Sequence, residues 1–222
     1  MTVDAVPVAR IDLAALVRNV RGASGDPVVA LSHDAYGHGA RRVADALLAQ
    51  TDARLRVDDD PGLRALLSAH PRRVAAPDAV AADPGRIFGW QDGFAPVMTL
   101  IGTVLATKDL RAGEGVSYGY RHRAPHDTRI ALVTGGYAQG VVRSLGGRAS
   151  VALAGGAAPI VGRVAMDVCV VDIASHAVAR GDEAVFFGAG GEPVSGWTRT
   201  TGLRESEIVA AVGAHTRREW VA

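Results

Sequence analysis

Short apolar runs separated by glycine-rich turns fill the chain from residue 93 to residue 222. The runs read as strands, because each spans only a few residues and lies between turn-forming residues. Strands of this kind with glycine turns between them are typical of an antiparallel barrel or sandwich. We therefore predict an all-β domain over residues 93–222. The predicted strands are residues 97–107, 129–134, 149–153, 159–165, 168–173 and 184–187.

Two tyrosines of this region lie between glycines. Tyr118 belongs to the block Gly113–Gly119, and Tyr137 lies within Gly135–Gly140. Glycine permits positive φ and close backbone approach, so we predict each tyrosine on a tight turn with its hydroxyl facing outward. A pair of ordinary hairpin turns is the alternative interpretation, since a motif needs a matching structural context.

The first part of the chain has the pattern of β/α units. Residues 8–22 read as a strand followed by a helix, with Asp12 as the predicted N-cap. An apolar run at residues 28–31 is followed by the glycine-rich turn Ser32–Gly39 and a helix over residues 40–50. A complete eight-stranded β/α barrel takes about 250 residues. The residues before the β domain can therefore hold only part of one.

Several blocks together resemble the alanine racemase family. The blocks Gly113–Gly119 and Gly162–Asp167 follow one another in the order and at the spacing of that family's C-terminal domain. The turn Asp34–Gly39 resembles the family segment that carries the cofactor lysine. The resemblance implies an α/β N-terminal remnant of a TIM barrel over residues 1–92. It also implies an alanine racemase C-terminal-like antiparallel barrel, an all-β domain, over residues 93–222.

The resemblance further implies an active site shared between two chains. In alanine racemases, the tyrosine that matches Tyr118 is one of two acid–base groups, and it acts on the substrate bound by the partner subunit. Tyr137 and Met166 match residues that line the same pocket. We therefore expect a homodimer, in which Tyr118 of one chain faces the Tyr36 turn of the other.

The chain departs from the family at the cofactor. Ser32 stands where the family has the lysine that binds pyridoxal phosphate as a Schiff base, and serine lacks the amine that this bond requires. Lys108, in the β domain, is the only lysine of the sequence. By the same resemblance, Asp83 replaces an arginine beside the pyridine nitrogen, and Trp220 stands roughly at a tyrosine that touches the phosphate. We therefore expect no cofactor.

These departures favour a PLP-independent enzyme that acts on a small molecule by acid–base chemistry, with an isomerase, lyase or cyclase type of activity. We expect Tyr118, His33 and Tyr36 to be catalytic, because tyrosine and histidine can transfer protons in suitable surroundings. The predicted substrate-binding residues are Tyr137, Met166, Arg121 and Asp167. The alternative is a non-catalytic ligand-binding or assembly protein derived from an alanine racemase.

Composition narrows the range of partners. The formal net charge is +1 and the arginine pairs are scattered, which argues against a nucleic-acid surface. No apolar run reaches the roughly 18 residues of a membrane span, and we see no leader, so we expect a cytoplasmic protein. His33, Asp34 and His38 could be read as metal ligands. Their spacing matches no regular zinc motif, so we expect no metal.

Overall fold

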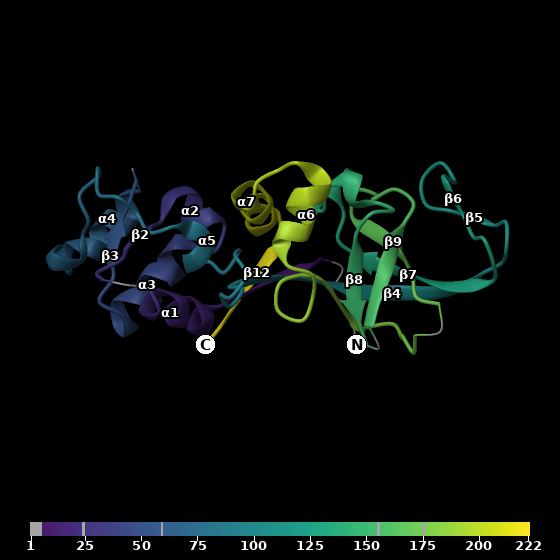
Figure 1. Cartoon of the computed structure of the whole chain (residues 1–222), viewed down its shortest axis with the longest axis horizontal. Helices are drawn as coiled ribbons and strands as arrows, with labels where there is room; N and C mark the ends of the chain where they lie inside the picture. Colours follow the sequence, from purple (N-terminus) through teal and green to yellow (C-terminus); the bar gives the residue numbers. More distant parts are fainter. Residues whose placement is uncertain (1–5, 24, 59, 155, 175) are drawn as a thin grey trace. The chain divides into compact units, whose positions relative to one another are not determined.

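The computed structural model describes residues 6–23, 25–58, 60–154, 156–174 and 176–222, which form two compact units (Figure 1). The barrel unit consists of Thr99–Arg217 together with the segment up to Ala9. The α/β unit consists of Arg10–Met98 together with Arg218–Ala222. Each unit therefore combines stretches from both ends of the chain, and the domain boundary predicted after residue 92 remains a prediction.

The barrel unit is built from antiparallel strands. Within the described residues, six strands follow the order β11-β8-β9-β10-β7-β4, and β11 also pairs with β4, which closes the barrel. All pairings around this ring are antiparallel. The all-β prediction for this part of the chain is therefore confirmed. The strands are β4 (Met98–Leu110), β7 (Thr128–Thr134), β8 (Ser150–Leu153), β9 (Gly156–Val161), β10 (Val168–Asp172) and β11 (Glu183–Phe187).

Alternating burial along the strands gives the barrel its interior. In β10, Cys169 and Val171 are buried and the residues between and beside them are half-exposed, as the two-residue period of a strand requires. Helix α6 (Val194–Thr201) adds the fully buried Trp197, whose ring meets Phe187 edge-on at 5.0 Å between centroids. Helix α7 (Glu205–His215) follows. Edge-to-face packing of large rings contributes stability beyond the area that they bury.

Short elements outside the barrel strands carry Tyr118 and Tyr137. A ribbon of two-residue strands, β5 (Gly115–Val116) and β6 (His122–Arg123), pairs antiparallel. Two 3₁₀ helices, η2 (Tyr137–Gln139) and η3 (Arg143–Leu145), lie between β7 and β8 in the sequence.

The α/β unit has a parallel strand pair. Strands β2 (Val28–Ala30) and β3 (Arg54–Arg56) pair in parallel, and Leu55 forms a further parallel bridge with Val74. The other elements are β1 (Val8–Asp12), α1 (Leu13–Arg21), α2 (Ser32–Tyr36), α3 (Ala40–Gln50), α4 (Pro61–Ser68), η1 (Pro71–Arg73), α5 (Pro84–Ile87) and β12 (Arg217–Val221). Strands β1 and β12 pair with each other.

Local sequence signals explain where the helices of this unit begin. The Asp12 carboxylate accepts a hydrogen bond of 2.7 Å from the Ala15 amide, so the predicted N-cap of α1 is confirmed. Asp60 caps α4 in the same way, with Pro61 at the first helical position. A parallel strand pair with intervening helices is a β/α arrangement. The prediction that it is a remnant of a TIM barrel goes further and remains a proposal.

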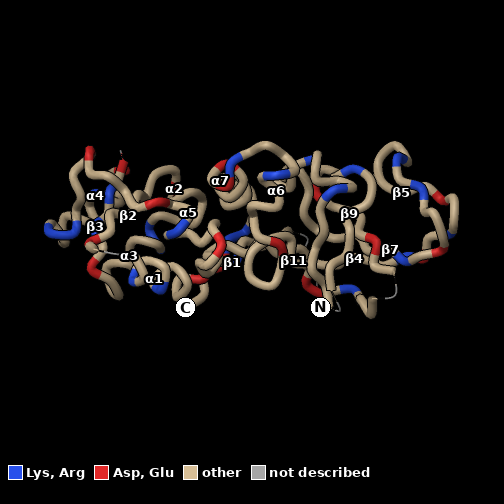
Figure 2. Tube along the Cα trace, viewed as in Figure 1, with Lys and Arg blue, Asp and Glu red and all other residues tan. Residues whose placement is uncertain are grey.

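Charged residues of both signs are interspersed along the described parts of both units (Figure 2). Among the described residues, no helix combines the length and the apolar character needed to cross a membrane.

Candidate functional site

Tyr118 lies at the tip of a tight turn in the barrel unit. The Tyr120 amide donates to the Ser117 carbonyl at 3.0 Å, which closes a four-residue turn with Tyr118 in its second position. Gly119 follows with φ +77°, where a type II turn needs a positive φ. The Tyr118 side chain is 74% exposed. The glycine pattern thus predicted the turn and the outward phenol.

The Tyr118 turn is tied to a distant segment of the barrel unit. The Ser117 hydroxyl accepts a hydrogen bond from the Arg163 amide and donates one to the Arg163 carbonyl, each at 2.8 Å. Arg163 belongs to the loop between β9 and β10, which continues to Met166 and Asp167. Residues 117 and 163 are 46 positions apart, and their pairing has no signal in the sequence.

Tyr137, in η2, lies beside this same loop, which contains Met166. The Tyr137 amide donates to the Ala165 carbonyl, and the Ala138 amide donates to the Met166 carbonyl, both at 3.0 Å. The side chains of Tyr137 and Met166 are 40% and 54% exposed. The guanidinium of Arg143 lies 5.2 Å from the centre of the Tyr137 ring, a distance at which cation–π attraction operates. Sequence reasoning did not place Arg143 in the site.

Asp167 and Arg121 are two of the residues predicted to bind a substrate. The Asp167 carboxylate accepts a 2.9 Å hydrogen bond from the side-chain amide of Gln139, whose oxygen in turn accepts from the Gly136 amide. This chain of bonds fastens the start of η2 to the loop before β10. Arg121 is exposed on the Tyr118 ribbon. Roles for both residues in binding a substrate remain predictions.

His33 and Tyr36 belong to the α/β unit. His33 is exposed, whereas the half-buried Tyr36 ring meets Phe88 and Trp90 edge-on, at 5.6 and 5.4 Å between centroids. These two predicted catalytic residues therefore lie in a different unit from Tyr118, and their joint action with it remains a prediction.

The turn that carries His33 and Tyr36 is left-handed. Four consecutive non-glycine residues, 33 to 36, have φ between 52° and 57°. This conformation costs about 1–2 kcal/mol for each residue, so surrounding bonds must hold it. The Asp34 carboxylate accepts a 2.7 Å hydrogen bond from the Ala40 amide and pairs with the Arg218 guanidinium. Strain of this kind is typical of functional segments.

Ser32, which by resemblance occupies the place of the family's cofactor lysine, is the first residue of α2. Nearby, the Trp220 indole donates a 2.9 Å hydrogen bond to the His38 carbonyl. The same ring fills the space beside Gly39, where an added Cβ would lie 2.8 Å from the ring carbon Cζ2. The guanidiniums of Arg42 and Arg218 lie 5.7 and 5.4 Å from the ring centre.

The Asp83 side chain caps the N-terminus of helix α5. One carboxylate oxygen accepts a 2.8 Å hydrogen bond from the Gly85 amide, and the other accepts from the Gln91 side chain at 2.6 Å. The exposed Lys108 lies on β4, in the other unit. Serine at position 32, an anion at position 83 and an indole at position 220 do not fit a Schiff-base pyridoxal phosphate, so the α/β unit of this chain does not fit that cofactor.

His38 is a buried structural histidine. Burial lowers the pKa of His38 from 6.5 to about 4, partly opposed by its backbone hydrogen bonds and by Asp34. Its Nδ1 is paired with the Ala35 carbonyl at 2.8 Å, and its ring lies 4.5 Å from the Phe88 ring centre. In the part of the chain that the structure describes, no group of three or more potential ligands could hold a metal ion.

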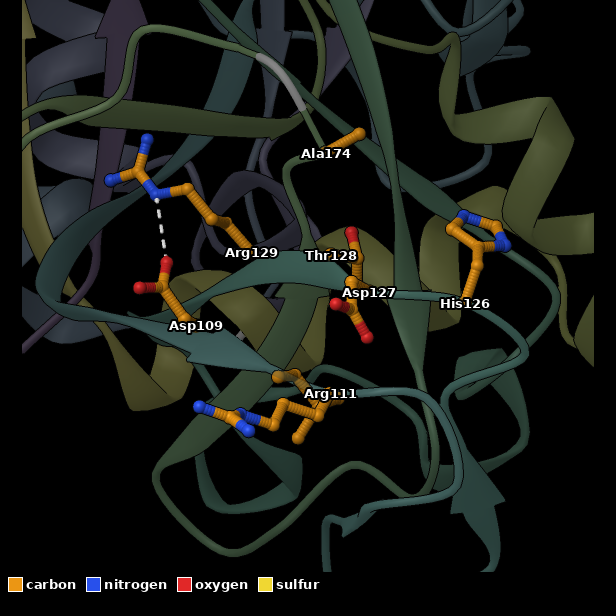
Figure 3. A pocket seen from close by; sticks show the side chains of 8 residues that line it. Asp109, Arg111, His126, Asp127, Thr128, Arg129 and Ala174 are labelled. Carbon is orange, nitrogen blue, oxygen red and sulfur yellow. Dashed lines mark ion pairs between the residues drawn. The ribbon is translucent and has the colours of Figure 1, made fainter.

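A surface basin of about 640 Å³ lies elsewhere on the barrel unit (Figure 3). Among its charged groups, Arg129 pairs with Asp109 at 3.6 Å, and Asp127 accepts a 2.8 Å hydrogen bond from the Ala112 amide. None of the predicted site residues lines it. The residues around the basin are Asp109, Leu110, Arg111, His126, Asp127, Thr128, Arg129 and Ala174.

The fold has close counterparts among solved structures. The alanine racemase from Streptomyces coelicolor A3(2) matches with a TM-score of 0.79 and 22% sequence identity, covering 98% of this chain and 98% of that chain. The alanine racemase from Bartonella henselae, solved with covalently bound pyridoxal phosphate, matches with a TM-score of 0.72 and 16% identity, covering 98% and 100%. The class of fold is therefore that of the alanine racemases.

A sequence relationship accompanies the similarity of fold. The family model for the alanine racemase C-terminal domain matches residues 97–220. The alanine racemase of Mycobacterium leprae (strain TN) is 45% identical over 133 residues, 58% of this chain and 34% of that protein. That of Mycobacterium tuberculosis (strain ATCC 25618 / H37Rv) is 47% identical over 124 residues, 54% and 32%. The chain belongs to the alanine racemase C-terminal domain family, and it spans about a third of the length of these curated relatives.

The relatives correct the function predicted from the sequence. They are named alanine racemase, and the Bartonella henselae enzyme holds pyridoxal phosphate covalently. The prediction of a PLP-independent enzyme, with a non-catalytic derivative as its alternative, is therefore wrong. The error came from weighing Ser32 of the α/β unit above the barrel unit, which the family model matches.

Proposed function

We propose that the chain takes part in pyridoxal-phosphate-dependent alanine racemisation, by supplying Tyr118 to an active site whose cofactor is held by another chain. The observation that carries the proposal is Tyr118 itself. It is exposed on a hydrogen-bonded turn within residues 97–220, which match the family model for the alanine racemase C-terminal domain. In this role, the Tyr118 hydroxyl gives or takes the proton at Cα of alanine.

The lysine-bearing half of such a site has to come from a different polypeptide. Ser32 cannot form the Schiff base, and the surroundings of Asp83 and Trp220 do not fit the cofactor. When bound, pyridoxal phosphate acts as the electron sink for the carbanion that forms at Cα. A full-length racemase subunit would bring the cofactor, and the chain described here would bring the tyrosine.

The exposed face around Tyr118 suits a contact with another chain. Tyr118, Tyr120, Tyr137 and Met166 are large side chains that the barrel unit leaves between 40% and 74% exposed. Exposed apolar groups gathered in one region typically mark an interaction site. We propose that this face binds the partner, and that the chain alone forms a homodimer through it. We also propose that the α/β unit derives from a shortened TIM barrel and that the protein is cytoplasmic.

The test is a mixed complex of two differently tagged chains. One is this protein, and the other is the Mycobacterium tuberculosis racemase with the tyrosine that matches Tyr118 replaced by phenylalanine. The replaced racemase should lose about 10²–10⁴-fold in rate on its own. We expect the doubly tagged complex, purified over both tags, to recover a substantial part of the activity as D-alanine formation.

Two matched variants of this protein make the result specific. Tyr118→Phe removes only the hydroxyl and should abolish the recovery, whereas Tyr120→Phe alters the other exposed tyrosine of the turn and should leave it intact. A doubly tagged complex without activity, or the absence of any complex, would refute the proposed function.

A further inference from the structure

We propose that Ser117 is a positioning residue for Tyr118: its hydroxyl fastens the Tyr118 turn to residues 162–166 and thereby sets the place of the phenol relative to Tyr137 and Met166. The proposal rests on the proposed function, because it gives Ser117 a part in presenting an acid–base tyrosine.

The hydroxyl of Ser117 uses both of its hydrogen-bonding capacities on one residue. It accepts from the Arg163 amide and donates to the Arg163 carbonyl, both at 2.8 Å. The ribbon that carries the turn has strands of only two residues, β5 and β6, and a hairpin so short is marginal by itself. At its base the ribbon packs through Val116 and Ala124 against Leu110 and Ile130, and at its tip the pair of Ser117 bonds joins it to the loop before β10.

The backbone on both sides is shaped for this contact. Gly162 has φ +68°, and a Cβ added to it would overlap the Cβ of Ser117. Ser117 itself has φ +69°, in the left-handed region that non-glycine residues rarely adopt. Ser117 therefore keeps an unfavourable backbone conformation at the point where its hydroxyl bonds to Arg163 in the loop between β9 and β10.

The loop that bonds to Ser117 contains Met166 and is also hydrogen-bonded to the segment of Tyr137. Its Ala165 carbonyl accepts from the Tyr137 amide, and its Met166 carbonyl accepts from the Ala138 amide. A Cβ on Gly136 would overlap the backbone of Met166, so these two segments lie in direct contact. The loop between β9 and β10 is thus bonded both to the Tyr118 turn and to the segment of Tyr137. Ser117 provides the bonds to the Tyr118 turn.

Two variants alter the contact between Ser117 and residues 162–163, one from each segment. Ser117→Ala removes both hydrogen bonds, and Gly162→Ala places a methyl group against the Ser117 side chain. Their matched controls are Ser144→Ala, an exposed serine of the barrel unit, and Gly147→Ala, at a glycine with φ +74° and open space around it. The control glycine shares the cost of positive φ with Gly162 and lacks its close neighbour.

Two measurements separate positioning from general stability. Hydrogen exchange on the protein alone should show the amides of Arg163 and Tyr120 exchanging at least about tenfold faster in both test variants, and at the normal rate in both controls. In the mixed complex, kcat should fall by roughly 10–100-fold, since small misplacements of a reacting group cost that much. The KM should change by less than about twofold.

The outcomes distinguish the two proposals. Unchanged exchange in Ser117→Ala, or faster exchange with unchanged kcat, would overturn the role of Ser117. If the wild-type chain restores no activity in the mixed complex, the proposed function fails. The role of Ser117 in presenting an acid–base tyrosine then fails with it, and the exchange rates still show whether Ser117 holds the turn.

Discussion

His38 is enclosed by its own turn, the aromatic rings of the α/β unit and the end of the chain. Its ring is fully buried, and Asp34 and Arg218 are the charged groups whose fields act on it. A histidine whose pKa is lowered by folding is neutral in the native state and protonated in the unfolded state over the range between the two values. The unfolded state therefore binds more protons between pH 4 and 6.5.

We predict that this histidine makes the α/β unit less stable in mild acid. Its contribution is fully present above pH 6.5 and is lost as the pH falls toward 4, the value reached in the folded state. The full loss is about 3 kcal/mol, at about 1.4 kcal/mol for each pKa unit. Urea unfolding at pH 7.5 and pH 4.5, monitored by hydrogen exchange in α3, measures the greater part of this loss.

The matched comparison uses two histidines of the same turn. His38→Gln removes the titrating group and should flatten the pH dependence, whereas His33→Gln changes an exposed side chain and should leave it as in the wild type. Equal pH dependence in all three proteins would contradict the prediction.

The site residues were predictable from the sequence only as far as local backbone rules reach. Glycine on either side of Tyr118 and Tyr137 indicated turns, because positive φ is a local property. The partners of Ser117 and Asp167 were not predictable, since Arg163 and Gln139 are 46 and 28 positions away. Side chains that lie far apart in sequence meet through the register of strands, which the apolar pattern does not determine.

Strand β12 secures the left-handed turn of the α/β unit through its side chains. Trp220 covers Gly39 and donates to the His38 carbonyl, and Arg218 pairs with Asp34. The sequence indicated neither contact. It predicted Trp220 as a lost cofactor contact, and the structure shows what the indole does in this chain.

We predict that Gly39→Ala destabilises the α/β unit by more than Gly25→Ala. Both glycines have positive φ, at 88° and 77°, so both variants lose the roughly 1–2 kcal/mol of an unfavourable conformation. Only the Cβ at position 39 meets a neighbour, the Trp220 ring, and Gly25 has open space. Urea unfolding should show an additional loss of about 1–3 kcal/mol for Gly39→Ala.

A double-mutant cycle identifies the cause. In a Trp220→Ala background, the additional cost of Gly39→Ala should disappear, because the colliding ring is absent. An additional cost that persists without the indole would show that the prediction is wrong.

The two units differ in how well the sequence predicted them. Short strands and glycine turns gave the barrel unit, because a closed antiparallel barrel is built from that local pattern. The α/β unit was predicted as a strand–turn–helix, and α2 and α3 follow β2 in the structure. The membership of the last five residues in this unit was not predictable, since it depends on a strand pair between the two ends of the chain.

We predict that the protein alone is a homodimer and that Met166→Glu weakens it. A carboxylate in a contact face opposes burial, so the dimer dissociation constant should rise at least about tenfold. Light scattering over a wide range of protein concentration measures the change. Val80→Glu, at a 90% exposed position of the α/β unit, is the control and should leave association unchanged. A wild-type monomer at all concentrations would contradict the prediction.

The closure of the barrel through β4 and β11 has a consequence for how such a chain can evolve. All six strands of the ring are encoded between Met98 and Phe187. Deletions and insertions within residues 13–97 therefore remove no strand of the barrel, and they leave in place β1, which pairs with β4. The α/β unit can therefore change in length during evolution without a change in the strand order of the barrel that carries Tyr118.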